Sequence, residues 1–317
     1  MPKNRAISSV AMQVLRVSVI VVDSVLLSGG VQAADWPNPL CVNLTSKSDG
    51  VSQDDDNDGF SALVGPAGRL RVSINYANAI DGKCVDPVTG QVCPTTGPPP
   101  ANAIYSGIGV DLGCELAARL DVPLDIVPYS GKAAQTAGFY AGAWDVGFTY
   151  DPITGLPAGM AAGHPHVLVE LTFVVPAGVP YAQVADVPRD AVINVAAGST
   201  GVLLLGQLGY TNVHQVANGG AALNRVQFGE VAAVGRSIGV PFAAAPANNA
   251  RIFSDNYGYG NATMATRAGS PQAIHYLSVF VEWAKKKGLV QRAINAVSPP
   301  LIGVQVPPPQ KVGGVAH

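Results

Sequence analysis

The sequence predicts an α/β fold in which short parallel strands alternate with helices. Three observations predict it: β-rich apolar runs recur from Arg69 onward, helix-period stripes separate them, and the alternation occurs twice, before and after an apolar run that ends at 176–178. Strands separated by helical runs favour parallel sheets with helices on both faces. The chain has 317 residues, 48% of them hydrophobic, which is enough for one large or two ordinary domains and excludes disorder throughout.

The first series of elements begins at Leu70. Residues 70–74 alternate apolar and polar side chains, which is typical of a half-buried strand. Leu112, Leu116 and Leu120 are four residues apart and form one stripe of a helix. The later elements predicted in this series are a strand at 124–127, a helix at about 130–142, a strand at 144–148 and an extended apolar segment at 167–175.

The second series repeats this order. Its predicted elements are a strand at 192–195, a helix at 202–208 opened by residues 198–201, a strand at 213–216, a helix at about 220–228 and a strand at 230–235. A final helix has an apolar face from Tyr276 to Ala284, and it ends in three lysines before Gly288, where a helix terminus favours cations and then glycine. The Pro-rich residues 301–317 are predicted to be a disordered tail.

The N-terminal segment has the features of an export signal. Lys3 and Arg5 precede an apolar run at 17–27, and small residues end at Ala33, so residues 1–33 are interpreted as a cleaved signal peptide. Asp23 lies inside the apolar run and weakens this interpretation, which leaves an uncleaved anchor or a misplaced start as alternatives.

Residues 34–68 are predicted to be an acidic leader. Within it, the aspartates of segment 54–58 resemble the first half of a calcium loop, but the twelfth position would be Gly65 and not Glu. A solvated acidic linker is therefore favoured over a calcium site.

The four cysteines and the net charge restrict the cellular setting. An even number of cysteines is consistent with an oxidising compartment. Cys84 and Cys93 bracket two turn-forming dipeptides, so we expect a Cys84–Cys93 disulfide together with Cys41–Cys114, and buried free thiols are the alternative. The net charge of −2 offers no basic surface for nucleic acid.

The order of these motifs resembles the family 3 extracellular solute-binding proteins, the periplasmic receptors of ABC transporters. The matching stretches are GRLRV at 68–72, GIGVDL at 107–112, ELA at 115–117, AGAWDV at 141–146, TFVVPAG at 172–178, FVEWAK at 280–285 and GLV at 288–290. The resemblance implies a two-lobe periplasmic-binding-protein-like fold of type II, with two hinge strands and a ligand cleft between the lobes. Mapped here, lobe 1 is 69–175 with 262–300, and lobe 2 is 177–260.

The resemblance also implies a function. It suggests a monomeric periplasmic receptor that captures a small solute for an ABC permease of the inner membrane, with no cofactor, no metal and no enzymatic step. Amino-acid receptors of the family carry an Arg before a D-F-S-x-P-Y motif, but Leu156 stands at the Arg position and Ala161 at the Asp. In lobe 2, Ser237 stands near the position at which the family's amino-acid receptors carry an Asp. We therefore expect a polar or anionic solute and not a standard amino acid.

The candidate ligand-binding residues follow predicted strands. Ser199 and Thr200 open a helix whose free N–H groups favour an anion. A Ser that serves only as the N-cap of the helix would give the same sequence pattern. Arg236 offers a guanidinium in place of the missing Arg. The other candidates, which lie at the expected mouth of the cleft, are Asn75, Tyr76, Thr149, Tyr150 and Asp151.

Two rival functions remain open at this stage. His164 and His166 flank Pro165 and could share one face of an extended segment, which would suit a metal-binding protein or a family-3-like enzyme. A degenerate member without a transport role is the other alternative, because the usual ligand anchors are missing.

Overall fold

The computed structural model describes residues 41, 63–65, 68–94 and 98–312. The predicted signal peptide, the calcium-like segment at 54–58 and residues 313–317 lie outside the described residues. Among those that are described, no helix is both long enough and apolar enough to cross a membrane.

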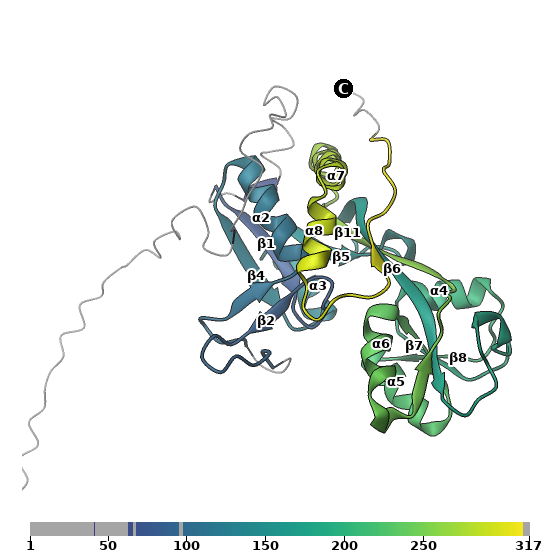
Figure 1. Cartoon of the computed structure of the whole chain (residues 1–317). Helices are drawn as coiled ribbons and strands as arrows, with labels where there is room; N and C mark the ends of the chain where they lie inside the picture. Colours follow the sequence, from purple (N-terminus) through teal and green to yellow (C-terminus); the bar gives the residue numbers. More distant parts are fainter. Residues whose placement is uncertain (1–40, 42–62, 66–67, 95–97, 313–317) are drawn as a thin grey trace, which may run out of the picture. The chain divides into compact units, whose positions relative to one another are not determined.

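One mixed sheet organises the described chain (Figure 1). Its ten strands include a path in the order β4-β1-β5-β11-β6-β9-β7-β8, with β10 and β12 also paired to β6. These strands are β1 (Leu70–Asn75), β4 (Leu124–Tyr129), β5 (Val146–Tyr150), β6 (Met160–Pro176), β7 (Ile193–Ala196), β8 (Val213–Val216), β9 (Val231–Gly235), β10 (Ala250–Ile252), β11 (Gly258–Arg267) and β12 (Val304–Gln305). A separate hairpin pairs β2 (Lys83–Val85) with β3 (Ile104–Ser106).

The helices lie between these strands in sequence. They are α2 (Ile108–Leu120), α3 (Lys132–Tyr140), α4 (Thr200–Gln207), α5 (Gly219–Asn224), α6 (Arg236–Ala244), α7 (Pro271–Lys286) and α8 (Leu289–Ala296). Short 3₁₀ turns occur at η2 (Pro152–Thr154), η3 (Val184–Asp186), η4 (Arg225–Phe228) and η5 (Pro246–Asn248). Each long helical pattern seen in the sequence corresponds to one of these helices.

The predicted parallel pairings are confirmed in both halves of the sheet. β1 pairs in parallel with β4 and β5, and β7 pairs in parallel with β8 and β9. The middle of the sheet is antiparallel, because β11 pairs with β5 and β6, and β6 pairs with β9.

Side-chain alternation explains why helices cover both faces of the second half. On β6, Phe173 and Val175 pack with Leu205 of α4, whereas Val174 between them packs with Ala222 and Leu223 of α5. Successive side chains of a strand point to opposite faces, so each face of β6 acquires its own apolar cluster. The first half follows the same rule, with one cluster against α2, α7 and α8 and another around Phe139 of α3.

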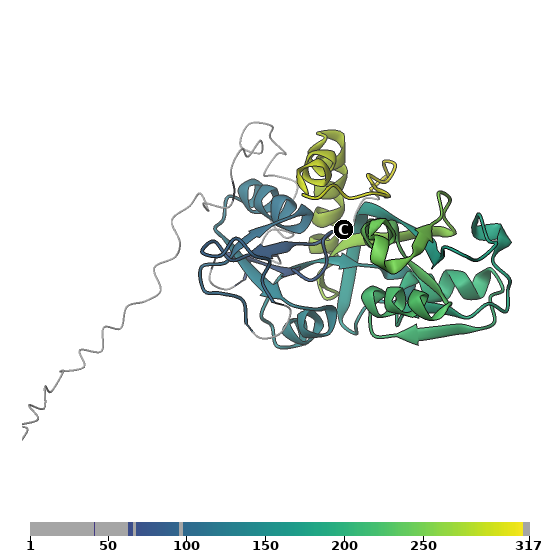
Figure 2. The ribbon, with the colours of Figure 1, turned by 60° about the horizontal axis from the view of Figure 1, so that its bottom comes forward.

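These clusters define two lobes. We call lobe 1 the described residues up to Val169 and from Ala262 onward, and lobe 2 the residues 171–257. The two views show β6 and β11 passing between the blue and green halves, so these strands are the two predicted hinge strands (Figure 2). The lobe boundaries expected from the sequence stay predictions, whereas the observed clusters change between Val169 and Leu171.

Two disulfides tie down lobe 1. Cys41 is bonded to Cys114 of α2, and Cys84 is bonded to Cys93. Both pairings match the favoured connectivity. The second one joins cysteines that are 9 positions apart in the sequence, and its Cys84 lies on β2 of the β2–β3 hairpin.

The end of the described chain corrects one prediction. Residues 301–312 were expected to be disordered, but β12 pairs with β6 at Leu168 and Val169, on the hinge itself. The Glu170 N–H also donates to the Gly303 carbonyl at 2.7 Å. The high proline content predicted disorder, but an extended segment can be held against an edge of a sheet by only a few backbone hydrogen bonds.

Candidate functional site: a cavity between the lobes

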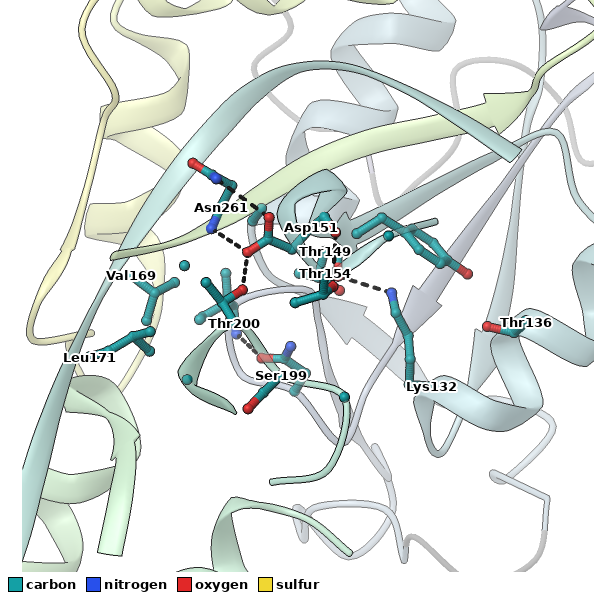
Figure 3. A pocket seen from close by; sticks show the side chains of 18 of the residues that line it. Lys132, Thr136, Thr149, Asp151, Thr154, Val169, Leu171, Ser199, Thr200 and Asn261 are labelled. Carbon is teal, nitrogen blue, oxygen red and sulfur yellow. Dashed lines mark hydrogen bonds between the residues drawn. The ribbon is translucent and has the colours of Figure 1, made fainter. Parts of the chain in front are cut away.

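A cavity of about 360 Å³ lies where the lobes and both hinge strands meet (Figure 3). It lies beyond the ends of β5 and β7 and at the start of α4, which is where open α/β sheets bind ligands. Its lining residues are Asn78, Ile80, Lys132, Thr136, Thr149, Tyr150, Asp151, Thr154, Gly155, Pro157, Val169 and Ala262 from lobe 1, Leu171, Gly198, Ser199, Thr200 and Gly201 from lobe 2, and Gly260 and Asn261 on β11 between the lobes.

The cavity brings together five of the eight candidate residues. Thr149, Tyr150 and Asp151 follow β5, and Ser199 and Thr200 open α4, so the two sets reach the cavity from opposite lobes. Asn75, Tyr76 and Arg236 do not line it.

Tyr76 and Asn75 are used in the packing of lobe 1. The Tyr76 ring is buried against Cys84 and Cys93, and its hydroxyl donates to the Pro94 carbonyl at 3.3 Å. The Asn75 side-chain oxygen accepts from the Ala77 N–H at 3.1 Å in a local turn. The disulfide-bonded Cys84 and Cys93 pack against the Tyr76 ring at this strand end, so the ring does not line the cavity.

Arg236 was also expected at the cleft, but it is not among the residues that line this cavity. Its guanidinium pairs with Glu170 at 2.5 Å and donates to the Ser254 carbonyl at 2.6 Å. The reason is the alternation along β6: Val169 and Leu171 line the cavity, so Glu170 between them points to the other face and draws Arg236 with it.

Lys132 is the main residue that sequence reasoning missed. Its ammonium lies 3.1 Å from the centroid of the Tyr150 ring and donates to the Thr149 carbonyl at 2.9 Å. Among the described residues, no carboxylate oxygen lies within 4.0 Å of this nitrogen. Burial lowers the Lys132 pKa to about 8, partly opposed by the more distant Asp81. Its place just after β4, at the start of α3, follows the same strand-end rule that found Asp151.

The buried carboxylate of Asp81 interacts electrostatically with this lysine. Asp81 is fully buried and accepts hydrogen bonds from the Asn75 N–H at 2.8 Å and the Thr149 hydroxyl at 3.1 Å. Burial raises its pKa to about 6, while the charge of Lys132 and these hydrogen bonds act in the opposite direction.

Thr149 connects the two charged groups through an unusual backbone conformation. Its φ of 57° lies in the left-handed region, which is unfavourable for a β-branched residue. In this conformation its carbonyl faces Lys132 while its hydroxyl reaches Asp81. Strain of this kind persists only where the surroundings enforce it, and it concentrates at binding sites.

The lobe 2 side of the cavity is uncharged. The Ser199 hydroxyl donates to the Ala196 carbonyl at 2.7 Å, and the Thr200 hydroxyl donates to Asp151. Neither hydroxyl proton is therefore free for a ligand. What remains is the start of α4, where the Thr200 and Gly201 N–H groups precede the first helical hydrogen bond, from the Val202 N–H to the Ser199 carbonyl at 3.0 Å. Gly201 is required there, because a Cβ would lie 2.9 Å from the Val195 side chain.

The two histidines lie away from the cavity. His166 is buried edge-on against Phe148, with a ring-centroid distance of 5.4 Å, and burial lowers its pKa to about 3. His164 is hydrogen-bonded to Glu282 at 2.9 Å. Across the part of the chain that the structure describes, no cluster of three His, Cys, Asp or Glu side chains could hold a metal ion.

Comparison with known proteins supports the fold but gives no close relative. No family model matches the sequence, and no curated protein matches it. The amino acid ABC transporter substrate-binding protein AbpA of Streptococcus pneumoniae, bound to L-arginine, superposes with a TM-score of 0.56 and 14% identity over 74% of this chain and 96% of its own. A mutant of ArgBP from T. maritima gives 0.54 and 17% over 75% and 98%.

A third similar structure is that of a protein described as the precursor of an enzyme. The ancestral amino acid-binding protein AncCDT-1, a precursor of cyclohexadienyl dehydratase, gives a TM-score of 0.53 and 18% identity over 73% of this chain and 95% of its own. At these identities the likeness establishes the fold alone. The chain thus has the two-lobe, type II fold found in the substrate-binding proteins of amino acid ABC transporters, as the order of its sequence motifs predicted.

Proposed function

We propose that this chain is an exported receptor that captures a small polar or anionic solute between its lobes and delivers it to an ABC permease of the inner membrane. The observation that carries the proposal is the cavity itself, which is lined from both lobes and from both hinge strands. A volume of about 360 Å³ is at the small end of ligand pockets, so it suits a small solute. Closure of hinged lobes around a ligand needs no cofactor.

The charges of the cavity favour an anion. Lys132 brings a partly desolvated positive charge with no carboxylate in direct contact among the described residues, and an anionic group of the solute would pair with it. Asp151 is the one carboxylate among the lining residues, and its oxygens already accept hydrogen bonds from Thr200, Ile153 and Asn261.

The usual anchors for an amino acid do not face this cavity. Leu156 packs against the apolar cluster around Trp144, and neither Ala161 nor Ser237 is among the lining residues. The carboxylate and ammonium of a zwitterion both need partners on leaving water, because an unpaired buried charge costs several kcal/mol. We therefore expect standard amino acids to bind weakly.

Export is part of the proposal. Two disulfides are stable in an oxidising compartment and rare in the cytosol. Fractionation of cells that produce the full chain would find the protein outside the inner membrane and shortened near Ala33.

The test is a thermal-shift screen followed by calorimetry, with small carboxylates, their neutral amides and standard amino acids as the solutes. A solute that binds only the folded state raises the melting temperature with its concentration. Lys132→Met should weaken binding of the best carboxylate by roughly 10- to 100-fold, the value of a charge-assisted hydrogen bond, and should leave its amide largely unaffected.

Lys286→Met is the matched control, because this exposed lysine on α7 is not a lining residue. Tight binding of a standard amino acid that survives Lys132→Met would contradict the proposal.

A further inference from the structure

Asp151 is held in place by its own lobe. It is the first residue after β5 and caps η2, where its Oδ1 accepts from the Ile153 N–H at 3.0 Å. A capping bond of this kind fixes the side-chain rotamer, so the second carboxylate oxygen, Oδ2, points in one direction only.

The partners of this second oxygen lie outside lobe 1. Oδ2 accepts a hydrogen bond from the Thr200 hydroxyl at the start of α4 in lobe 2, and another from the Asn261 N–H of β11 at 3.0 Å (Figure 3). One carboxylate therefore connects lobe 1, lobe 2 and a hinge strand.

The surroundings make this bond a strong one. Thr200 is buried, and a hydrogen bond shielded from water is electrostatically stronger than the same bond at a surface. A carboxylate beside the first turn of a helix is also favoured by the helix dipole. The hydroxyl of Thr200 also donates to a carboxylate, and a hydrogen bond to a charged acceptor is charge-assisted.

We propose that Asp151 and Thr200 form a latch that holds the two lobes closed, and that both residues act by positioning α4 against lobe 1 instead of binding the solute. The inference rests on the proposed function for its meaning. It assigns a role to two residues that the sequence suggested as direct ligand contacts. Opening the cavity separates β5 of lobe 1 from α4 of lobe 2, so this hydrogen bond breaks whenever the lobes part.

The first experiment measures the distance between the lobes without any solute. Tyr140 of α3 and Phe228 of η4 are 60% and 72% exposed, and all four native cysteines are in disulfides, so Tyr140→Cys and Phe228→Cys accept a pair of spin labels. We expect a short distance in the parent chain. Thr200→Val, which keeps the shape and removes the hydroxyl, should lower the ratio of closed to open molecules roughly tenfold.

Two further variants separate the latch from a general loss of structure. Thr200→Ser restores the hydroxyl and should restore the short distance. Asp151→Ala breaks the same bond from the other lobe and also removes the Ile153 and Asn261 hydrogen bonds. Adding Thr200→Val to Asp151→Ala should give little further opening, because the bond that Thr200→Val removes is already lost. An unchanged distance distribution in both Thr200→Val and Asp151→Ala would overturn the inference.

The second experiment tests how the latch affects binding. With the best solute of the screen, Thr200→Val should weaken affinity by a similar factor for a carboxylate and for its amide, because closure is common to both. A change in the preference between the two would show that Thr200 contacts the solute and would overturn the positioning role. The distance measurement needs no solute, so failure of the proposed function and failure of the latch give different results.

Discussion

The two lobes contribute different chemistry to the same cavity. Lobe 1 supplies a cation, Lys132, with the buried Asp81 behind it and the strained Thr149 between them. Lobe 2 supplies the start of α4, whose two hydroxyls are already engaged. If the proposed function holds, this difference predicts a division of labour, in which lobe 1 selects the charge of the solute and lobe 2 closes over it.

The lobes also differ in how they are stabilised. All four cysteines lie in lobe 1, so both disulfides are there. Lobe 2 relies on aromatic packing around Phe173, whose ring stacks on Tyr257 at 4.9 Å and meets Tyr210 edge-on at 5.6 Å. A cross-linked lobe and a lobe without cross-links should therefore respond differently to loss of a core side chain.

The largest expected effect comes from Phe173→Ala. Removing this fully buried ring should cost about 3–5 kcal/mol of stability, and the loss should fall on lobe 2. Trp144 and Trp283 are in lobe 1, and the third tryptophan, Trp36, lies outside the described residues. None of the three is within residues 171–257, so tryptophan fluorescence does not report directly on lobe 2, whereas far-UV circular dichroism reports on both lobes.

In urea, the circular dichroism transition of Phe173→Ala should precede the fluorescence transition. Phe228→Ala, at an exposed site in the same lobe, is the control and should change little. Coincident transitions with equal shifts would show that the lobes unfold as one unit.

The next effect is the pH dependence of lobe 1. The unfolded chain loses the Asp81 proton near pH 3.8 and the folded chain near 6, so the folded state holds more protons between these values. This group therefore lowers stability as pH rises from about 4 to about 6. Asp111 acts in the same direction and the buried His166 in the opposite one, so the difference between variant and parent is the quantity to measure.

The free energy of unfolding of Asp81→Asn, measured relative to that of the parent, should increase from pH 4 to pH 6. Asp111→Asn should show a similar trend, since burial also raises its pKa to about 6. The two should differ in solute binding, because only Asp81 lies behind Lys132. A flat difference for Asp81→Asn across this range would mean that its carboxylate is ionised in the folded state already at pH 4.

The smallest effect is expected from Arg236→Ala. This arginine pairs with Glu170 on the side of β6 that faces away from the cavity, so solute affinity should stay within about twofold of the parent. Loss of carboxylate binding in this variant, with Lys132→Met harmless, would reverse the assignment of the anion-binding residue.

Local sequence patterns predicted the parallel halves of the sheet because each strand there buries its own apolar face. The same patterns missed β11, whose first residues are Gly258, Tyr259, Gly260 and Asn261. Its position depends on pairing with β5 and β6, which lie far away in sequence. Contacts of that kind leave no periodicity to recognise.

The residues that line the cavity were predictable where the end of a strand alone determines their position. Thr149, Tyr150, Asp151, Ser199 and Thr200 follow directly from that rule. The errors arose where another part of the chain intervened: a disulfide-bonded loop covers the Tyr76 ring, and the alternation of a hinge strand turns Arg236 away. The role of the Thr200 hydroxyl depends on a hydrogen bond across 49 residues of sequence, which no local pattern encodes.

The segment that follows α8 has a practical consequence for sensor engineering. Residues 301–312 pair with β6 at the hinge through β12, and beyond it the Gln310 N–H donates to Glu282 of α7 at 3.0 Å. Gly303 fits against Arg236 so closely that a Cβ would lie 2.7 Å from its side chain. A fluorescent reporter inserted just after Gln310 would therefore be anchored close to the hinge strand β6. If the lobes close over a solute as proposed, the closure should change the emission of this reporter.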